Sequence, residues 1–272
     1  MNYFGSQAAA VRYDRGRPHF HANTIGHIKA YLHLDHKLDS ALDIACGTGL
    51  STKALLAIAE KVFGTDLSEE MLKVAPAEDG VTYCVAPAER QPFPDHKFDL
   101  VTVSSGVHWF NIDEFLAEAG RLLKKDAFLV VYENAFPGEM ENQTNFARWN
   151  KEVYLQRFPS PPRNNTYQWT PANLETQKLV LSQTESFQNA VKFTRAELTA
   201  YLITQSNVIA AVESAKFTYA EIEGWLKTEL AAFFENDHAR HVFYFNNWIK
   251  YLQKYNISLL REILFVGVQI WH

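Results

Sequence analysis

Residues 41–50, Ala-Leu-Asp-Ile-Ala-Cys-Gly-Thr-Gly-Leu, constrain the fold of this chain more than any other stretch. The small and apolar residues up to Ala45 predict a buried strand, and Gly47 and Gly49 predict a tight turn after it. Residues 51–59 then carry apolar side chains at helical spacing. A strand, a glycine turn and a helix form the first half of a βαβ unit, in which the turn lets a ligand approach the backbone closely.

A second predicted strand, residues 61–66, ends in the carboxylate of Asp66, which lies 66 − 43 = 23 residues beyond Asp43. In dinucleotide-binding folds, an acid about 20 residues after the turn binds a ribose. Two ligand classes compete for such a site, dinucleotides and S-adenosylmethionine (SAM). The dinucleotide fingerprint has Gly or Ala three residues after its second glycine, where this chain has Thr52. This difference argues against a dinucleotide as the ligand without excluding it.

Predicted strands alternate with predicted helices along much of the chain, which indicates a mostly parallel sheet covered on both faces. Apolar runs and alternating patterns predict further strands at 81–86, 98–105, 127–132, 187–193 and 263–271. Residues 1–22 are expected to be irregular, with Asn23 or Thr24 capping the first helix. Helix caps are predicted at Ser68, Asn111, Thr170, Thr194 and Thr218, with one helix over 194–209 and another helical stretch near His238 and His241.

Bulk composition excludes several function classes. The chain has 272 residues, 47% of them hydrophobic, which suits one large domain. Its net charge of −5 argues against general binding to nucleic acids or anionic membranes. No apolar run approaches the roughly 18 residues of a membrane span, and residues 1–13 lack the apolar core of a signal peptide. Two cysteines without metal spacing, and histidines without companion ligands, predict no metal site and a cytoplasmic location.

Four segments carry a resemblance to a known family: 42–49 (LDIACGTG), 64–72 (GTDLSEEML), 88–93 (AERQPF) and 107–110 (VHWF). With them the sequence resembles the class I SAM-dependent methyltransferases, and in particular the small-molecule group that includes trans-aconitate methyltransferases. The resemblance implies an α/β, Rossmann-like, doubly wound, seven-stranded and mostly parallel sheet, with the last strand antiparallel and a helical cover inserted after strand 5. It also implies SAM as cofactor and a small-molecule methyl acceptor, without a nucleic-acid or membrane partner.

The same resemblance implies one methyltransferase domain over 1–272. Its expected parts are an N-terminal helical segment (1–40), a SAM-binding core (41–135), a cover (136–184) and C-terminal strands and helices (185–272).

The cofactor contacts that the resemblance implies lie at the ends of the first four strands and in one N-terminal residue. Those around the methionine part of SAM are Asp43, Ala45, Gly47 and Gly49, with Arg17 reaching its carboxylate. Those around the adenosine are Asp66 on the ribose hydroxyls, Leu67 and Met71 against the adenine, and Ala88 and Glu89 at its edge. Ser104 and Ser105 end the fourth strand beside the cofactor.

Two residues after the fourth strand are candidates for catalysis. His108 has the pKa class of a base at neutral pH, and Trp109 offers a ring face to a cationic sulfonium or substrate. Packing roles for both side chains remain alternatives. Two departures from the family pattern are Ala45 in place of Gly, a small change that the turn is expected to tolerate, and Pro87 in place of Asp. The change at Pro87, in the adenine region, leaves room for a catalytically inactive SAM-binding protein. An NAD-dependent oxidoreductase is a further alternative.

Overall fold

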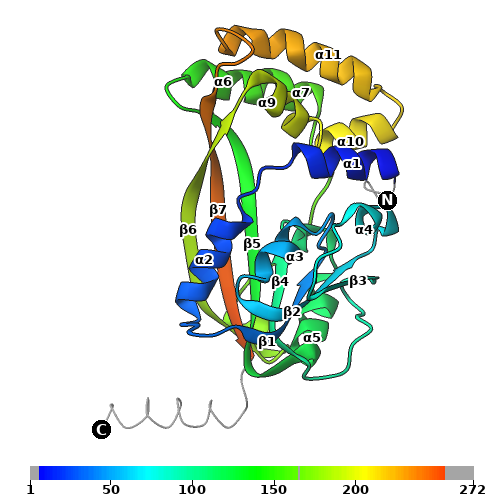
Figure 1. Cartoon of the computed structure of the whole chain (residues 1–272), viewed down its shortest axis with the longest axis vertical. Coiled ribbons are helices and arrows are strands. Elements are labelled where there is room, and N and C mark those ends of the chain that lie inside the picture. Colours follow the sequence, from blue (N-terminus) through cyan, green and yellow to red (C-terminus); the bar gives the residue numbers. More distant parts are fainter. Residues whose placement is uncertain (1–5, 165, 255–272) are drawn as a thin grey trace.

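One sheet of seven strands organises the computed structural model, which describes residues 6–164 and 166–254 (Figure 1). Its spatial order is β3-β2-β1-β4-β5-β7-β6. Strands β1 to β5 pair in parallel, whereas β7 pairs antiparallel with both β5 and β6. The strands are β1 (Leu38–Ile44), β2 (Ala59–Asp66), β3 (Val81–Val85), β4 (Phe98–Ser104), β5 (Leu123–Met140), β6 (Leu179–Phe193) and β7 (His241–Lys254). The predicted mostly parallel sheet of seven strands with an antiparallel last strand is confirmed.

The strand order reverses at β1, which pairs with β2 on one side and with β4 on the other. From residue 40 to residue 44 every β1 residue is buried, because both faces of the sheet are covered. In open parallel sheets, ligands bind outside the carboxyl ends of the strands at such a switch point. The topology therefore brings the ends of β1, β2 and β4 together as the candidate site.

The helices divide between the sheet layer and a separate helical layer. The first group is α2 (His21–Tyr31), α3 (Leu50–Leu55), α4 (Glu69–Val74), the 3₁₀ turn Val107–Trp109, α5 (Ile112–Leu122) and α8 (Pro171–Glu175). The second is α6 (Thr144–Trp149), the π-helical turn Asn150–Tyr154, α7 (Leu155–Arg157), α9 (Arg195–Leu202), α10 (Ser206–Glu213), α11 (Tyr219–Leu230) and the 3₁₀ turn Ala231–Phe233. Helix α1 (Gln7–Gly16) contacts α4 of the first group and α9 of the second.

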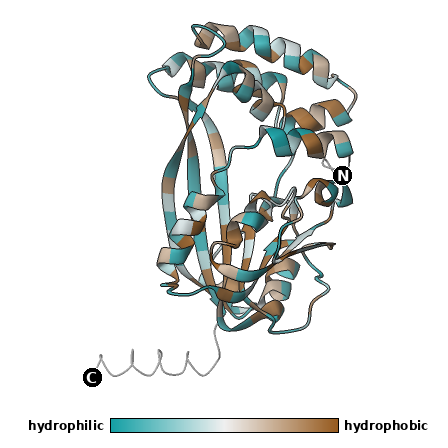
Figure 2. Ribbon diagram, viewed as in Figure 1, coloured by the Kyte–Doolittle hydropathy of each residue, from teal (hydrophilic) through white to brown (hydrophobic). Residues whose placement is uncertain are grey.

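The long strands β5, β6 and β7 extend past the shorter strands and carry the helical layer at their far end (Figure 1). Side chains of Phe146, Phe243 and Phe245 help to form its core, separate from the two cores that flank the sheet. Hydrophobic and hydrophilic residues alternate along these helices, as expected of helices that bury one side (Figure 2). The cover expected over 136–184 is thus only part of this layer, because β5 runs on to Met140 and β6 begins at Leu179.

The N-terminal segment is more helical than the sequence analysis predicts. Residues 7–16, expected to be irregular, form α1, and the Ser6 hydroxyl caps it by accepting a backbone N–H at 3.3 Å. A run of alanines favours this helix. Helix α2 begins at His21 rather than after Asn23 or Thr24, and no side chain caps it.

The prediction of a helical stretch near His238 and His241 is wrong, because residues 241–254 form strand β7. Phe243, Phe245 and alternate residues after them are buried, and the intervening side chains are more exposed. This period of two, carried by aromatic residues, is typical of a strand.

The helix predicted over 194–209 is divided into α9 and α10. The Thr204 hydroxyl donates to the Tyr201 carbonyl at 2.6 Å and so offers the backbone an alternative to the helical bond. The capping boxes predicted at the start of α9 and at Thr218 are confirmed. The strand predicted at 263–271 lies outside the described residues. In the described part of the chain, no helix is both long and apolar enough to cross a membrane.

Candidate functional site

The turn after β1 has a backbone that few residues adopt readily. Ala45, Gly47 and Gly49 all have left-handed conformations, with φ of 56°, 57° and 79°. A side chain on Gly49 would also place its Cβ 2.3 Å from the Tyr83 hydroxyl oxygen. The glycines are therefore required by the turn itself, and Ala45 occupies a conformation that costs an L-residue roughly 1–2 kcal/mol.

Asp66 joins the second strand to this turn. One carboxylate oxygen accepts the Gly47 N–H at 2.8 Å, and the other accepts the Ser68 N–H at 2.8 Å. Burial raises the pKa of the Asp66 carboxyl, and backbone N–H groups of Ser68, Gly47 and Leu67 favour its ionised form. A carboxylate has about four lone-pair sites, so these donors leave one for a ligand hydroxyl. Asp66 is therefore placed to hold the turn and to accept a hydroxyl donor from a ligand.

Asp43, expected at the methionine part of the cofactor, is fully buried and already bonded within the chain. Its carboxylate accepts from the hydroxyls of Ser51 at 2.6 Å, Thr52 at 2.8 Å and Thr102 at 2.9 Å. Burial raises its pKa to about 6, against the effect of these three hydroxyls. These bonds fasten the ends of β1 and β4 to the start of α3, so Asp43 fixes the shape of the turn.

A hollow lies between the turn, the end of β4 and residues 17–20, which connect α1 to α2 and are called the strap below. Its walls include Arg17, Phe20 and His21 on the strap side, Ala45 and Gly47 on the turn, and Ser104 and Ser105 at the end of β4. The structure thus brings together predicted cofactor contacts that are far apart in the sequence. Arg17 donates to the Thr204 carbonyl at 2.9 Å, and its buried Nε has no partner within the described residues.

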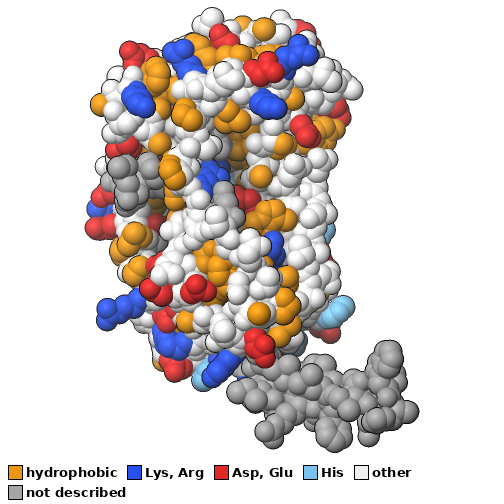
Figure 3. Space-filling model, turned by 180° about the vertical axis from the view of Figure 1, so that it is seen from behind, with side chains coloured by type: hydrophobic (Ala, Val, Ile, Leu, Met, Phe, Trp, Pro, Cys, Tyr) orange, Lys and Arg blue, Asp and Glu red, His pale blue; other side chains and the backbone are white. Residues whose placement is uncertain are grey.

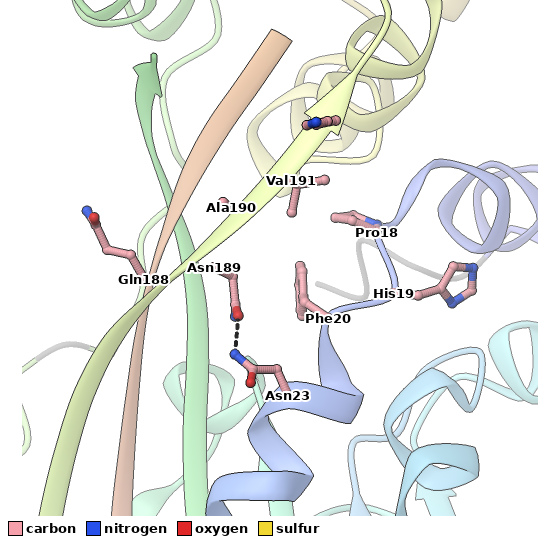
Figure 4. Close-up of a pocket in the computed structure, with 9 residues that line it drawn as sticks. Pro18, His19, Phe20, Asn23, Gln188, Asn189, Ala190 and Val191 are labelled. Carbon is pink, nitrogen blue, oxygen red and sulfur yellow. Dashed lines mark hydrogen bonds between the residues drawn. The ribbon is translucent and has the colours of Figure 1, made fainter. Parts of the chain in front are cut away.

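On its other side the strap borders a second hollow of about 490 Å³, beside the edge strand β6 (Figure 4). Asn23 donates to Asn189 on that strand at 2.7 Å. The strap is therefore flanked by open space on two sides and depends on α1 for its position. Helix α1 packs closely on α9, because a Cβ on Gly16 would lie only 2.4 Å from the Ala200 carbonyl oxygen.

The residues expected around the adenine differ in exposure. Leu67 is 64% exposed, which leaves an apolar side chain free beside Asp66. Met71 and Ala88 are buried, and the methyl group of Met71 lies against the Gly47 turn. Glu89 accepts the Asn111 N–H at 2.9 Å, so its carboxylate fixes the start of α5. The assignment of these residues to the adenine stays a prediction.

The catalytic candidates lie where the sheet layer meets the helical layer. His108 is buried, and Trp109 is 38% exposed beside it, with 4.7 Å between the ring centroids. Burial lowers the pKa of the His108 imidazole to about 4, helped by the positive charge of Arg163. Arg163 donates to the Ser206 hydroxyl at 2.7 Å and reaches across from the loop before α8. Figure 3 shows charged side chains of both signs between the two layers on this face.

Three further residues complete the surroundings of the site and were not predicted from the sequence. Glu133 on β5 places a carboxylate oxygen 3.8 Å from Nδ1 of His108. Tyr132, the residue before it, hydrogen-bonds through its hydroxyl to Nδ1 of His21 at 3.0 Å. Burial lowers the pKa of His21 to about 4. The one sequence signal was that Tyr132 and Glu133 end the apolar run of the fifth strand, at the same edge as Ser104.

Comparison with known proteins also indicates a methyltransferase domain. A family model for the methyltransferase domain matches residues 42–131. A Dictyostelium discoideum protein named as a methyltransferase is 36% identical over 100 residues, 37% of this chain and 38% of that protein. A demethylmenaquinone methyltransferase of Symbiobacterium thermophilum is 34% identical over 131 residues, 44% of this chain and 50% of that protein. A solved chain described as a type II methyltransferase from Anaeromyxobacter dehalogenans has a TM-score of 0.62 at 21% identity, covering 78% of this chain and 88% of its own, which shows a shared fold.

Residues 42–131 form a SAM-dependent methyltransferase domain. This confirms the family and the cofactor class that the sequence motifs predict, whereas trans-aconitate as acceptor stays a prediction. The family match ends within β5, before the helical layer begins. The chain spans half or less of the two curated relatives, 50% and 38%. The likeness therefore covers the cofactor half of the site together with His108 and Trp109, whereas Glu133 and Arg163 lie beyond it.

Proposed function

We propose that this protein transfers a methyl group from SAM to a small-molecule acceptor bound between the two layers. The observation that carries the proposal is the arrangement of Asp66, whose carboxylate holds the Gly47 turn and keeps a lone-pair site for a ribose hydroxyl. The hollow beside this turn is lined by Arg17, whose buried and unpartnered Nε suits a carboxylate of the ligand.

The residues present fit SAM across the glycine turn, from Asp66 on one side to the hollow on the other. Gly47 and Gly49 keep the turn free of side chains, Asp66 takes the ribose and the exposed Leu67 covers the adenine. Arg17 receives the methionine carboxylate in the hollow. When bound, SAM supplies a methyl group on a sulfonium, which is already a good electrophile. The protein's contribution is then to align the acceptor and exclude water.

The acceptor is proposed to lie next to His108, Trp109 and Arg163, because these side chains lie together beyond the end of β4. The lowered pKa keeps His108 neutral at pH 7, which leaves a ring lone pair for a hydroxyl, amine or acidic carbon but makes the imidazole a weaker base than an ordinary histidine. The Symbiobacterium relative bears the name demethylmenaquinone methyltransferase. For this chain, the proposed acceptor has an O-, N- or C-nucleophile, including a carboxylate.

Titration calorimetry with S-adenosylhomocysteine (SAH), the demethylated product, tests the cofactor half of this proposal. We expect heat of binding that saturates at one SAH per chain, and none with NAD⁺. Release of SAH from SAM is then measured against a panel of small acids, phenols, amines and quinols. Absence of SAH binding contradicts the proposal. Binding without turnover on any class of acceptor favours a SAM-binding protein that has no methyltransferase activity.

A further inference from the structure

Glu133 places a partly buried carboxylate beside the catalytic candidate His108. It lies on β5 opposite Trp248 of β7, and its Oε2 is 3.8 Å from Nδ1 of His108. The Glu133 side chain is 19% exposed and that of His108 is 10% exposed. Among the described residues, no other basic side chain comes within ion-pair distance of this carboxylate. Glu133 is therefore placed toward the imidazole, with the Ser105 hydroxyl as a second neighbour.

Even partial burial is costly for a carboxylate with few polar neighbours. Burial raises the pKa of Glu133, while the nearby Ser105 hydroxyl and the positive charges of Arg163 and Arg17 act in the opposite direction. The Glu133 charge is in turn one of the causes, after burial itself, that raise the pKa of Tyr201. Two cations facing the carboxyl from the loop before α8 and from the strap thus favour its ionised form.

The backbone around His108 is fixed on both sides. Its carbonyl accepts the Asn164 N–H at 2.9 Å, and the Trp109 N–H that follows bonds to Gly106 at 3.0 Å. These backbone bonds do not determine which ring nitrogen of His108 carries the hydrogen. A carboxylate that faces Nδ1 favours the tautomer with hydrogen on Nδ1, so that Nε2 presents its lone pair. The separation of 3.8 Å is longer than an N–H···O bond, and such pairs often tighten only when reactants bind.

We propose that Glu133 is a positioning residue that holds His108 in the Nδ1–H tautomer, with the Nε2 lone pair directed to the methyl acceptor. This inference rests on the proposed function and names a residue that neither the sequence motifs nor the family match assigns. In the proton step, the X–H bond of the acceptor breaks, its electron pair stays on X, and the proton forms a bond to Nε2. The Glu133 carboxylate then neutralises the imidazolium until the proton passes to water.

The test uses nitrogen-15 NMR of the histidine side chains in the full chain, with and without SAH. The chain has ten histidines, so the His108→Gln variant assigns the His108 signals. In the wild type we expect an unprotonated Nε2 and a protonated Nδ1 at pH 7. In Glu133→Leu, which has no acceptor, we expect the opposite tautomer or a mixture, because the carboxylate no longer selects Nδ1–H. In Glu133→Gln, we expect a lower imidazole pKa, because the charge is gone.

A matched control is provided by Glu185, whose carboxylate lies 3.2 Å from Nδ1 of His27 on the outer side of the sheet. Glu185→Leu is expected to leave the His108 tautomer unchanged, and all variants are compared for SAH affinity by calorimetry. An Nε2–H tautomer of His108 in the wild type, or the same tautomer in wild type and Glu133→Leu, overturns the inference. Loss of SAH binding in the wild type instead overturns the proposed function, so the two failures are distinguishable.

Discussion

Replacing Asp66 with alanine removes the group on which the cofactor assignment depends. The carboxylate keeps a lone-pair site for a ligand hydroxyl after bonding to the backbone of Gly47, Ser68 and Leu67. A hydrogen bond to a charged group contributes about 1.5–3 kcal/mol. One such bond at the lower end amounts to roughly tenfold in affinity. We therefore expect Asp66→Ala to raise the dissociation constant of SAH about tenfold or more in titration calorimetry.

Glu69→Gln is the matched control, because Glu69 lies three residues away on α4, is solvent-exposed and pairs with Lys73 on the surface. It removes the same charge from the same neighbourhood without touching the turn. We expect its dissociation constant to stay within about threefold of the wild type, since surface pairs contribute little. Thermal unfolding of both variants establishes that they are folded. Equal SAH affinity in Asp66→Ala and wild type would refute the ribose role of Asp66.

Three further predictions concern the frame of the site. Ala45→Gly relieves the left-handed strain at this residue but adds the entropy cost of glycine. We expect it to raise the free energy of unfolding by about 0.5–1 kcal/mol, measured in urea. The control Ala54→Gly, in helix α3, should instead lower the free energy of unfolding. For Asp43, a folded pKa of about 6 against the ordinary 3.8 means that stability is fully present below pH 4 and lost as pH rises through 6, by about 3 kcal/mol. Urea unfolding from pH 4 to 7 should show that loss in wild type relative to Asp43→Asn, and parallel curves would contradict it. Gly16→Ala should push α1 from α9, move Arg17 and weaken SAH binding severalfold by calorimetry, whereas an unchanged affinity would show that the strap is dispensable.

The sheet layer is predictable from sequence because its signals are local. The strand and turn of 41–50, the acid at the end of the second strand and the cap at Ser68 each depend on neighbours within a few residues. The family match over residues 42–131 supports these predictions. The prediction of a helical stretch near β7 fails because local signals conflict there. Its aromatic residues have a period of two, but histidines and a charged turn lie close to them in the sequence.

The acceptor side of the site depends on contacts between distant residues, which a single sequence does not reveal. Glu133 follows an apolar run and belongs to no motif. A role for it can be inferred only because the fold brings it next to His108. The strap reaches the glycine turn because α1 packs on α9, a contact that needs Gly16. Asp43 was assigned to the cofactor from its motif, whereas the structure surrounds it with three hydroxyls of this chain.

A crystal structure of the protein with SAH tests the central claim most directly. We predict that the ribose hydroxyls lie within hydrogen-bond distance of the Asp66 carboxylate, with the Gly47 N–H still bonded to it. The sulfur should face His108 and Glu133. A ribose bound elsewhere, or SAH excluded from the hollow between the glycine turn and the strap, would contradict the account.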